Sequence, residues 1–193
     1  MELSNRQTEI IEKSIEIIAN KGIQGLTIKN LSKEIGISEP AIYRHFASKV
    51  DILLAILDSF NQMSEMFSDI METFEGSAIE KIRFMFSKMI DVFSETPSLV
   101  SVIFSEEIFK NETVLKNQVI EIQNRNQKTV EMIIDKGKKE KNVRTDVDNG
   151  SLALIIMGSL RLLVKNWNLN AYGFCLQKEG KKLIHSIDLI LKP

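Results

Sequence analysis

Residues 26–49 read LTIKNLSKEIGISEPAIYRHFASK, and this stretch decides the fold. Leu31 and Ile35 stand four residues apart, which places them on one face of a helix. Gly36 follows where a chain needs a left-handed residue to leave a helix, and Ser38 begins a second periodic segment. The pattern predicts two short helices joined by a sharp turn, which is a helix-turn-helix.

The second helix of this motif is predicted to begin at Ser38, whose hydroxyl can cap it. Pro40 falls in the first turn, where its missing N–H is not needed, and Ile42 and Phe46 form the buried i, i+4 pair. The remaining side chains face outward and form a polar and aromatic surface suited to the DNA major groove and its flanking phosphates. These side chains belong to Glu39, Pro40, Tyr43, Arg44 and His45.

A dense set of residue types and spacings runs through residues 5–55. It comprises Gly22, Gly25, Leu26-Thr27, Leu31, Gly36-Ile37-Ser38, Ile42-Tyr43-Arg44-His45-Phe46 and Ser48-Lys49. This set resembles the DNA-binding domain of TetR/AcrR-type transcriptional regulators, and the rest of the chain resembles that family in length, helical character and layout. The resemblance implies an all-α fold, with a three-helix DNA-binding headpiece at residues 1–47 and a helical ligand-sensing and dimerisation domain at residues 48–193.

The composition is that of an ordinary globular protein, with 193 residues, 44% hydrophobic and 26% charged. A formal net charge of −1 argues against a protein that coats nucleic acid without sequence preference. The stretch from residue 27 to residue 49 nevertheless carries four basic side chains against two acidic ones, a local charge of +2. Dimerisation would double that charge, which is a physical reason to expect a dimer.

The single cysteine, Cys175, excludes an intramolecular disulfide, and residues 1–13 lack the apolar core of a secretion signal. The longest apolar run, at residues 152–164, is interrupted by Gly158, Ser159 and Arg161, and we expect it to be too short and too polar to span a bilayer. The sequence therefore predicts a cytoplasmic protein with no role in the membrane.

Helical periodicity continues along the whole chain, which has few glycines and prolines to interrupt it. The first helix is predicted to end at Gly22 and to bury Ile11, Ile15 and Ile18 against the helix-turn-helix. Ser48 is expected to cap the next helix, and Gly180 is expected to interrupt the last one. The predicted segments cover residues 7–20, 50–74, 77–94, 98–111, 112–141 and 146–167, and the last segment resumes after Gly180 with apolar residues from Leu183 to Leu191, before Pro193.

The resemblance assigns roles to the residues around the helix-turn-helix, with double-stranded operator DNA as the partner. Thr27, which could also cap the second helix, Tyr43, His45 and Lys49 would mainly contact phosphates. The candidates for contacts with base edges are Lys29, Glu39, Pro40, Ala41 and Arg44, and Ser38 lies on the same surface. In this family a helix starts at the position of Lys49, and its first amides and its lysine meet the DNA backbone.

The last two helices are apolar, and in TetR-type proteins the equivalent pair forms a four-helix bundle with its symmetry mate. The resemblance therefore implies a homodimer that reads a palindromic operator, with half-sites one helical turn, about 34 Å, apart. The alternative is that both helices only complete the core of a monomer.

The middle helices would then enclose a site for a small apolar or amphipathic ligand, because aromatic and methionine side chains form adaptable pockets. The same residues at helical spacing are also typical of plain core. The candidate walls are Phe67, Met71, Phe86, Phe93, Phe104, Met157, Arg161 and Trp167. Arg161 lies within an apolar run, so it is expected to pair with an acidic side chain or to meet an anionic ligand.

Features of an enzyme are missing from the sequence. Only two histidines, His45 and His185, and one cysteine occur, and no glycine-rich phosphate loop is present, so no catalytic residue, metal site or cofactor is predicted. The basic residues between Lys136 and Arg144 are interpreted as solvated surface. The remaining alternative is a helical ligand-binding or scaffold protein without operator binding.

Overall fold

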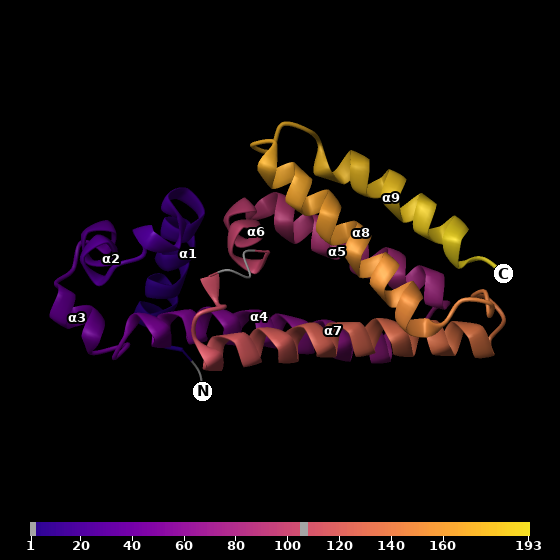
Figure 1. Cartoon of the computed structure of the whole chain (residues 1–193), viewed down its shortest axis with the longest axis horizontal. Coiled ribbons are helices and arrows are strands. Elements are labelled where there is room, and N and C mark those ends of the chain that lie inside the picture. The colour runs from indigo at the N-terminus through magenta and orange to yellow at the C-terminus, as the bar shows by residue number, and fades with distance from the viewer. Residues whose placement is uncertain (1–2, 105–107) are drawn as a thin grey trace.

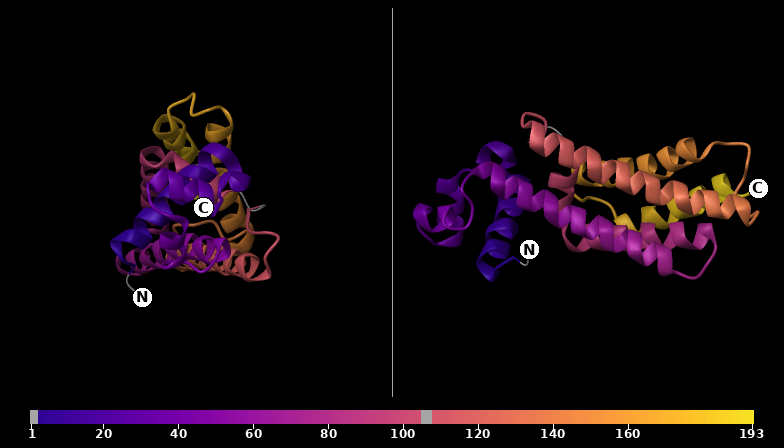
Figure 2. Two further views of the ribbon diagram at one scale, coloured as in Figure 1. Left: turned by 90° about the vertical axis from the view of Figure 1, so that its left-hand side faces the viewer. Right: turned by 90° about the horizontal axis from the view of Figure 1, so that it is seen from below.

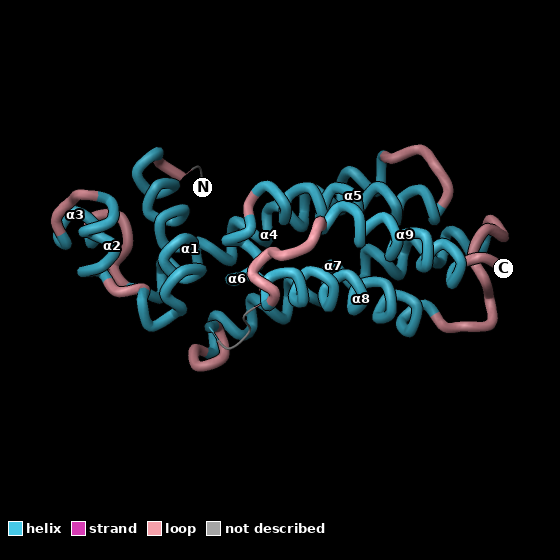
Figure 3. The backbone as a smooth tube through the Cα atoms, turned by 90° about the horizontal axis from the view of Figure 1, so that it is seen from above, coloured by secondary structure: helices cyan, strands magenta, loops and turns pink. Residues whose placement is uncertain are grey.

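The computed structural model describes residues 3–104 and 108–193, and these residues form nine helices and no strand (Figure 3). The predicted all-α fold is confirmed. The helices are α1 (Asn5–Gly25), α2 (Ile28–Ile35), α3 (Glu39–Tyr43), α4 (Lys49–Thr73), α5 (Ala78–Glu95), α6 (Pro97–Ile103), α7 (Thr113–Lys139), α8 (Asn149–Leu169) and α9 (Leu176–Leu191). The predicted segment 98–111 is therefore shorter as a helix, and its residues 105–107 lie outside the described part.

The molecule is elongated, with α1, α2 and α3 gathered at one end (Figure 1). The two longest helices, α4 and α7, run side by side from that end along the molecule (Figures 1 and 2). The other large helices, α5, α8 and α9, cover them at the far end. Because α4 begins beside the headpiece and ends among the later helices, it joins the two parts mechanically.

The first hydrophobic core holds the headpiece together. Ile11, Ile15 and Ile18 of α1 are buried in it, as predicted. The other predicted members are also buried, except Ile35, which is partly buried: these are Leu26, Leu31, Ile42 and Phe46. The core continues along α4 to Phe60 and includes Val102, Phe109 and Leu115. The division of the chain after residue 47 stays a prediction, and this core lies on both sides of it.

The second hydrophobic core lies at the far end of the molecule, where α5 and α8 pack on α7 and α9 packs on α5 and α8. Phe86 and Phe93 are among its largest fully buried side chains. Gly180 lies inside α9 and does not interrupt it, so that prediction is wrong. A Cβ at Gly180 would lie 2.2 Å from Cδ1 of Ile90, which shows that glycine permits the close packing of α9 on α5.

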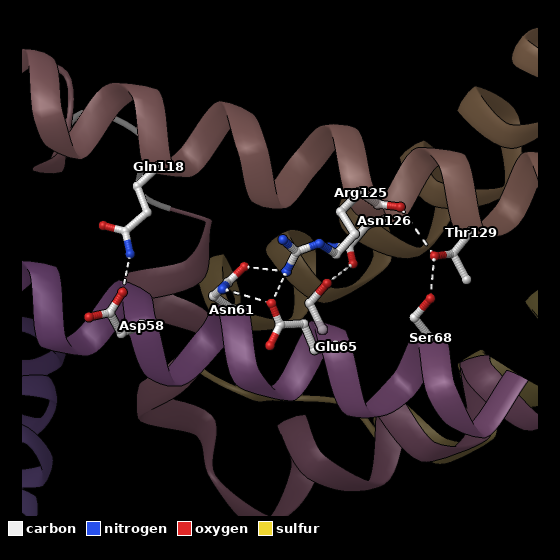
Figure 4. A network of polar contacts seen from close by, with 9 residues as sticks. Asp58, Asn61, Glu65, Ser68, Gln118, Arg125, Asn126 and Thr129 are labelled. Atoms are coloured by element: carbon white, nitrogen blue, oxygen red, sulfur yellow. Dashed lines mark hydrogen bonds and ion pairs between the residues drawn. The ribbon is translucent and has the colours of Figure 1, made fainter. Parts of the chain in front are cut away.

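A seam of polar side chains joins α4 to α7 between the two cores (Figure 4). The guanidinium of Arg125 donates to Asn61 at 2.6 Å and to Glu65 at 2.7 Å. Further along, the hydroxyls of Ser68 and Thr129 lie 3.2 Å apart. Ser64 and Asn126 are hydrogen-bonded, as are Asp58 and Gln118. Residue numbers rise together on both helices, so the seam fixes a parallel register.

The helix α8 is longer than the predicted apolar run, and by length and composition alone it could cross a membrane. One such helix is weak evidence, because the core helix of a soluble protein passes the same test. Its buried face, which includes Leu152, Ile156 and Val164, packs in the second core. The apolar residues on the buried face of α8 are therefore explained by packing in the second core.

An ion pair between Arg83 on α5 and Asp188 on α9 joins these helices across the second core. The Arg83 Nε donates to Oδ2 of Asp188 at 2.7 Å. The two ends differ in exposure, since half of the Arg83 side chain is exposed and only 6% of the Asp188 side chain is. The hydrogen bond to Asp188 raises the pKa of the Arg83 guanidinium, so the arginine stays charged.

Because Asp188 is buried and Arg83 is half exposed, we expect substitutions of the two residues to lower the free energy of unfolding by different amounts. Arg83→Met should lower the free energy of unfolding by about 3 kcal/mol, because it leaves a buried carboxylate without its cation. Asp188→Asn should cost less, about 1–2 kcal/mol: the guanidinium left behind is half in water and keeps a carbonyl acceptor, and the main loss comes from the new NH2 group at the buried Oδ1 position. Urea unfolding of both variants measures this, and equal losses would contradict it.

Candidate DNA-binding surface

The turn between α2 and α3 has the predicted geometry. The hydroxyl of Thr27 accepts a hydrogen bond from the Asn30 amide at 3.1 Å and so caps α2. Gly36 adopts the left-handed conformation, with φ 76° and ψ 31°. The amides of Gly36 and Ile37 both donate to the Ser32 carbonyl, at 2.9 and 3.0 Å, which closes the end of α2. Glycine is required here because an L side chain strains this conformation.

Ser38 takes the position before α3 but its hydroxyl makes no capping hydrogen bond, so that prediction is wrong. The reason lies in the next two positions. Pro40 has no N–H to donate, and the amide of Ala41 already donates to the backbone carbonyl of Ser38 at 2.9 Å. The hydroxyl of Ser38 is left exposed on the outer surface of the motif.

The predicted DNA-contact residues gather around α2, α3 and the start of α4, at the free end of the molecule (Figure 1). Tyr43 contributes an aromatic ring to this surface and is 51% exposed. Seven of the ten residues are exposed, namely Thr27, Lys29, Ser38, Glu39, Pro40, Tyr43 and Arg44, whereas Ala41, His45 and Lys49 are partly buried. The structure therefore brings the set together, while its contacts with DNA stay a prediction.

Lys49 differs from the other members because its ammonium already has a partner within the protein. Its Nζ donates to the backbone carbonyl of Ile23, at the end of α1, at 2.9 Å. Burial lowers the pKa of this lysine.

Two further contacts in the headpiece were not predicted from the sequence. The side-chain amide of Asn30 donates to the Gly25 carbonyl at 2.9 Å, which holds α2 to the end of α1. Lys21 and Glu34 form an exposed ion pair at 2.8 Å, and the hydrogen bond from Lys21 lowers the pKa of Glu34. Neither contact follows from helical periodicity, because each joins residues whose distance depends on how α1 and α2 pack.

The predicted ligand-site residues fall mainly in or against the second core. The rings of Phe93 and Phe104 meet edge to face, with centroids 5.6 Å apart, and the Arg161 guanidinium lies over the Phe104 ring at 5.4 Å. Met71, Phe86, Phe93 and Trp167 are buried there, Phe104 and Met157 pack against them, and Phe67 is partly buried on α4. Three of the predicted residues therefore form a cluster, in which the cation lies over one of two neighbouring rings.

Two hollows in the described part of the chain lie elsewhere. One of about 370 Å³ lies where α1 meets α6 and α8, between Gly22, Ser101 and Asn168. The other, of about 390 Å³, lies at the polar seam beside Asp58 and Gln118. Neither is lined by a predicted ligand-site residue, so a ligand that reaches Phe86 or Phe93 has to separate side chains that are now packed together.

The basic residues near the end of α7 are largely occupied within the protein. Lys139 pairs with Asp135 at 2.6 Å, and Arg144 pairs with Asp146 at 2.7 Å. The hydrogen bond from Arg144 lowers the pKa of Asp146 to about 2. This segment lies at the opposite end of the molecule from α3, which supports its interpretation as solvated surface (Figure 1).

A helix-turn-helix with an exposed outer face, carried on an all-helical domain, defines a DNA-binding transcriptional regulator. Residues 10–56 match the family described as bacterial regulatory proteins, tetR family. Residues 78–192 match the C-terminal region of MAATS-type transcriptional repressors. The chain belongs to the TetR family, and it is a DNA-binding transcriptional repressor rather than an enzyme.

The chain is similar to several known proteins over most of their length. The chain is 20% identical to the probable acrEF/envCD operon repressor of Escherichia coli K12, over 99% of this chain and 88% of that protein. It is 25% identical to the nucleoid occlusion factor SlmA of Vibrio cholerae, over 81% of this chain and 80% of that one. The crystal structure of the regulator FadR from Bacillus subtilis with stearoyl-CoA shares the fold, with a TM-score of 0.80 at 19% identity, over 95% and 98% of the two chains.

The exposed position of Arg44 at the end of α3 predicts a role in reading bases. Arg44→Ala should reduce the preference for one base pair of each half-site by about 1–3 kcal/mol. Competition binding with single-base operator variants measures this. An unchanged preference together with a weaker salt dependence would instead make Arg44 a phosphate contact.

Proposed function

We propose that this repressor binds a palindromic operator as a homodimer through α8 and α9, and that a small amphipathic ligand releases it. Because its target is DNA, we propose that the protein acts in the cytoplasm. The observation that carries the dimer is the apolar surface that α8 leaves uncovered. Leu154 and Leu169 are each 70% exposed, and Leu162 is 59% exposed.

Three of the exposed apolar side chains of α8 form one stripe together with Gly158. Ile155, Gly158, Leu162 and Leu169 follow at intervals of three, four and seven residues, the spacing at which one helix packs along another. All four are exposed, and a Cβ at Gly158 would meet no atom within 4 Å. Leu189 and Ile190 of α9 are exposed as well. A second copy of the chain presents the same stripe, so a two-fold axis would bury both at once.

Dimerisation through this face would give each complex two copies of α3. Each headpiece would place its α3 in the major groove, and the distance between the two would select the spacing of the half-sites. Displacement of α4 by a ligand would change that distance. The ligand releases the repressor only if it binds the displaced state more tightly than the DNA-bound state.

The dimer proposal predicts that Leu162→Glu gives a monomer, because the new charge would be buried against its symmetry mate. Light scattering should then report one chain, and operator affinity should fall by about a hundredfold or more as the second half-site is lost. Met66→Glu is the matched control, since Met66 is 64% exposed on α4, a helix that takes no part in the proposed interface. A dimeric Leu162→Glu protein would refute this interface.

The proposed ligand site is the cluster of Phe93, Phe104 and Arg161, together with the neighbouring second core. Rings and aliphatic side chains suit an acyl or aromatic body, and the guanidinium suits an anionic group. The shared fold of the stearoyl-CoA complex of Bacillus subtilis FadR supports an acyl compound as the first choice.

Trp167, the single tryptophan of the chain, lies buried in the second core and reports on it directly. Acyl-CoAs and free fatty acids of graded length should change its fluorescence and raise the melting temperature. At a hundredfold excess over Kd the stabilisation should be about 2.7 kcal/mol, a shift of several degrees. Coenzyme A alone is the control. If neither signal moves for any compound, the proposed ligand class is wrong.

A further inference from the structure

The end of α1 is an unusual helix terminus. Gly22 interrupts the helix with φ 67° and ψ 178°, and one more turn follows, from Ile23 to Gly25. The carbonyls at a helix end have no partner within the helix and need donors from elsewhere. Backbone amides supply two of these, from Leu26 to Ile23 at 3.2 Å and from Thr27 to Gly25 at 3.1 Å.

Two side chains from the following helices supply further donors to the same carbonyls. Asn30 of α2 donates to Gly25 at 2.9 Å, and Lys49 of α4 donates to Ile23 at 2.9 Å. The end of α1 is therefore fastened to both neighbours. A lysine ammonium is especially favourable at this place, because the carbonyl end of a helix carries partial negative charge.

Lys49 is the first residue of α4, and its contact with Ile23 spans 26 positions of the chain. The start of α4 is fixed independently, because the Ser48 hydroxyl accepts from the Asp51 amide at 3.2 Å. The lysine is partly buried, which limits how much of its ammonium can face DNA. Among the predicted phosphate contacts, it is thus the one whose charge is already engaged within the headpiece.

We propose that Lys49 is a positioning residue for operator binding: its ammonium clamps the start of α4 to the end of α1 and so sets the angle of the headpiece on α4. The family resemblance alone implies a phosphate contact for this lysine. The clamp acts differently, because it determines where α3 lies relative to the long helix. In the proposed homodimer, on which this step rests, that angle determines the separation of the two recognition helices.

The two roles give different salt dependences. A lost phosphate contact reduces the slope of log K against log salt by about 0.9, or about 1.8 for two subunits. A lost clamp leaves the phosphate contacts in place, so the slope stays the same. It lowers affinity because the headpiece then has to be ordered on binding, and it weakens the preference for one half-site spacing.

The experiment compares Lys49→Met, Lys49→Arg and Lys29→Met with the wild-type protein. Lys29→Met is the matched control, since it removes one exposed lysine charge from α2. Binding to an operator fragment selected from genomic DNA is measured at four salt concentrations, and again with half-sites moved by one and two base pairs. Melting temperatures and hydrogen exchange over residues 22–27 are measured without DNA.

For Lys49→Met we expect affinity to fall about tenfold with an unchanged salt slope, and the melting temperature to fall by about 3 °C. Discrimination between half-site spacings should weaken, exchange over residues 22–27 should accelerate, and Lys49→Arg should recover most of each loss. A slope reduced by about 1.8, with melting temperature and exchange unchanged, would overturn the proposal. If wild-type protein fails to prefer the operator, the operator proposal fails, and the exchange measurement still decides the clamp.

Discussion

The structure depends on α4 being held in two hydrophobic cores at once. Its first half lies in the headpiece core through residues such as Ile52, Ile56 and Phe60, and Met71 near its end lies in the second core. If one end of such a helix moves, the packing around its other end has to change as well. The headpiece is therefore carried by the larger domain and is not a separate module on a flexible linker.

Beyond the apolar contacts that they share in the first core, α4 and α7 are joined by a row of hydrogen bonds (Figure 4). Polar pairs fix a register because each donor needs a particular acceptor, whereas apolar surfaces tolerate sliding. Arg125 donates to both Asn61 and Glu65, which lie one turn apart on α4. The seam thus fixes the position of α4 along α7, and α4 carries the headpiece with its DNA-binding surface.

Hydrogen bonds between helices also hold the headpiece in one arrangement. Thr27 caps α2 within its own segment, but Asn30 and Lys49 satisfy carbonyls of α1 from other helices. Together with the first hydrophobic core, these donors hold α1 against α2 and the start of α4. Such rigidity matters for reading DNA, because an exposed side chain selects a base only if its backbone is already placed.

The helix-turn-helix could be predicted from the sequence because its signals are local: a left-handed glycine at 36, caps at Thr27 and Ser48, and the buried pair Ile42 and Phe46. The all-α fold and the family could be predicted as well, since periodicity and residue spacing are written along the chain. The predictions were wrong about the Ser38 cap and about Gly180, where backbone competition and the approach of α5 decide the outcome. Three contacts could not be predicted without the packed helices: Lys49 with Ile23, the polar pairs between α4 and α7, and Arg161 over Phe104. Each of these contacts joins residues far apart in the chain, and their distance is set by how whole helices pack.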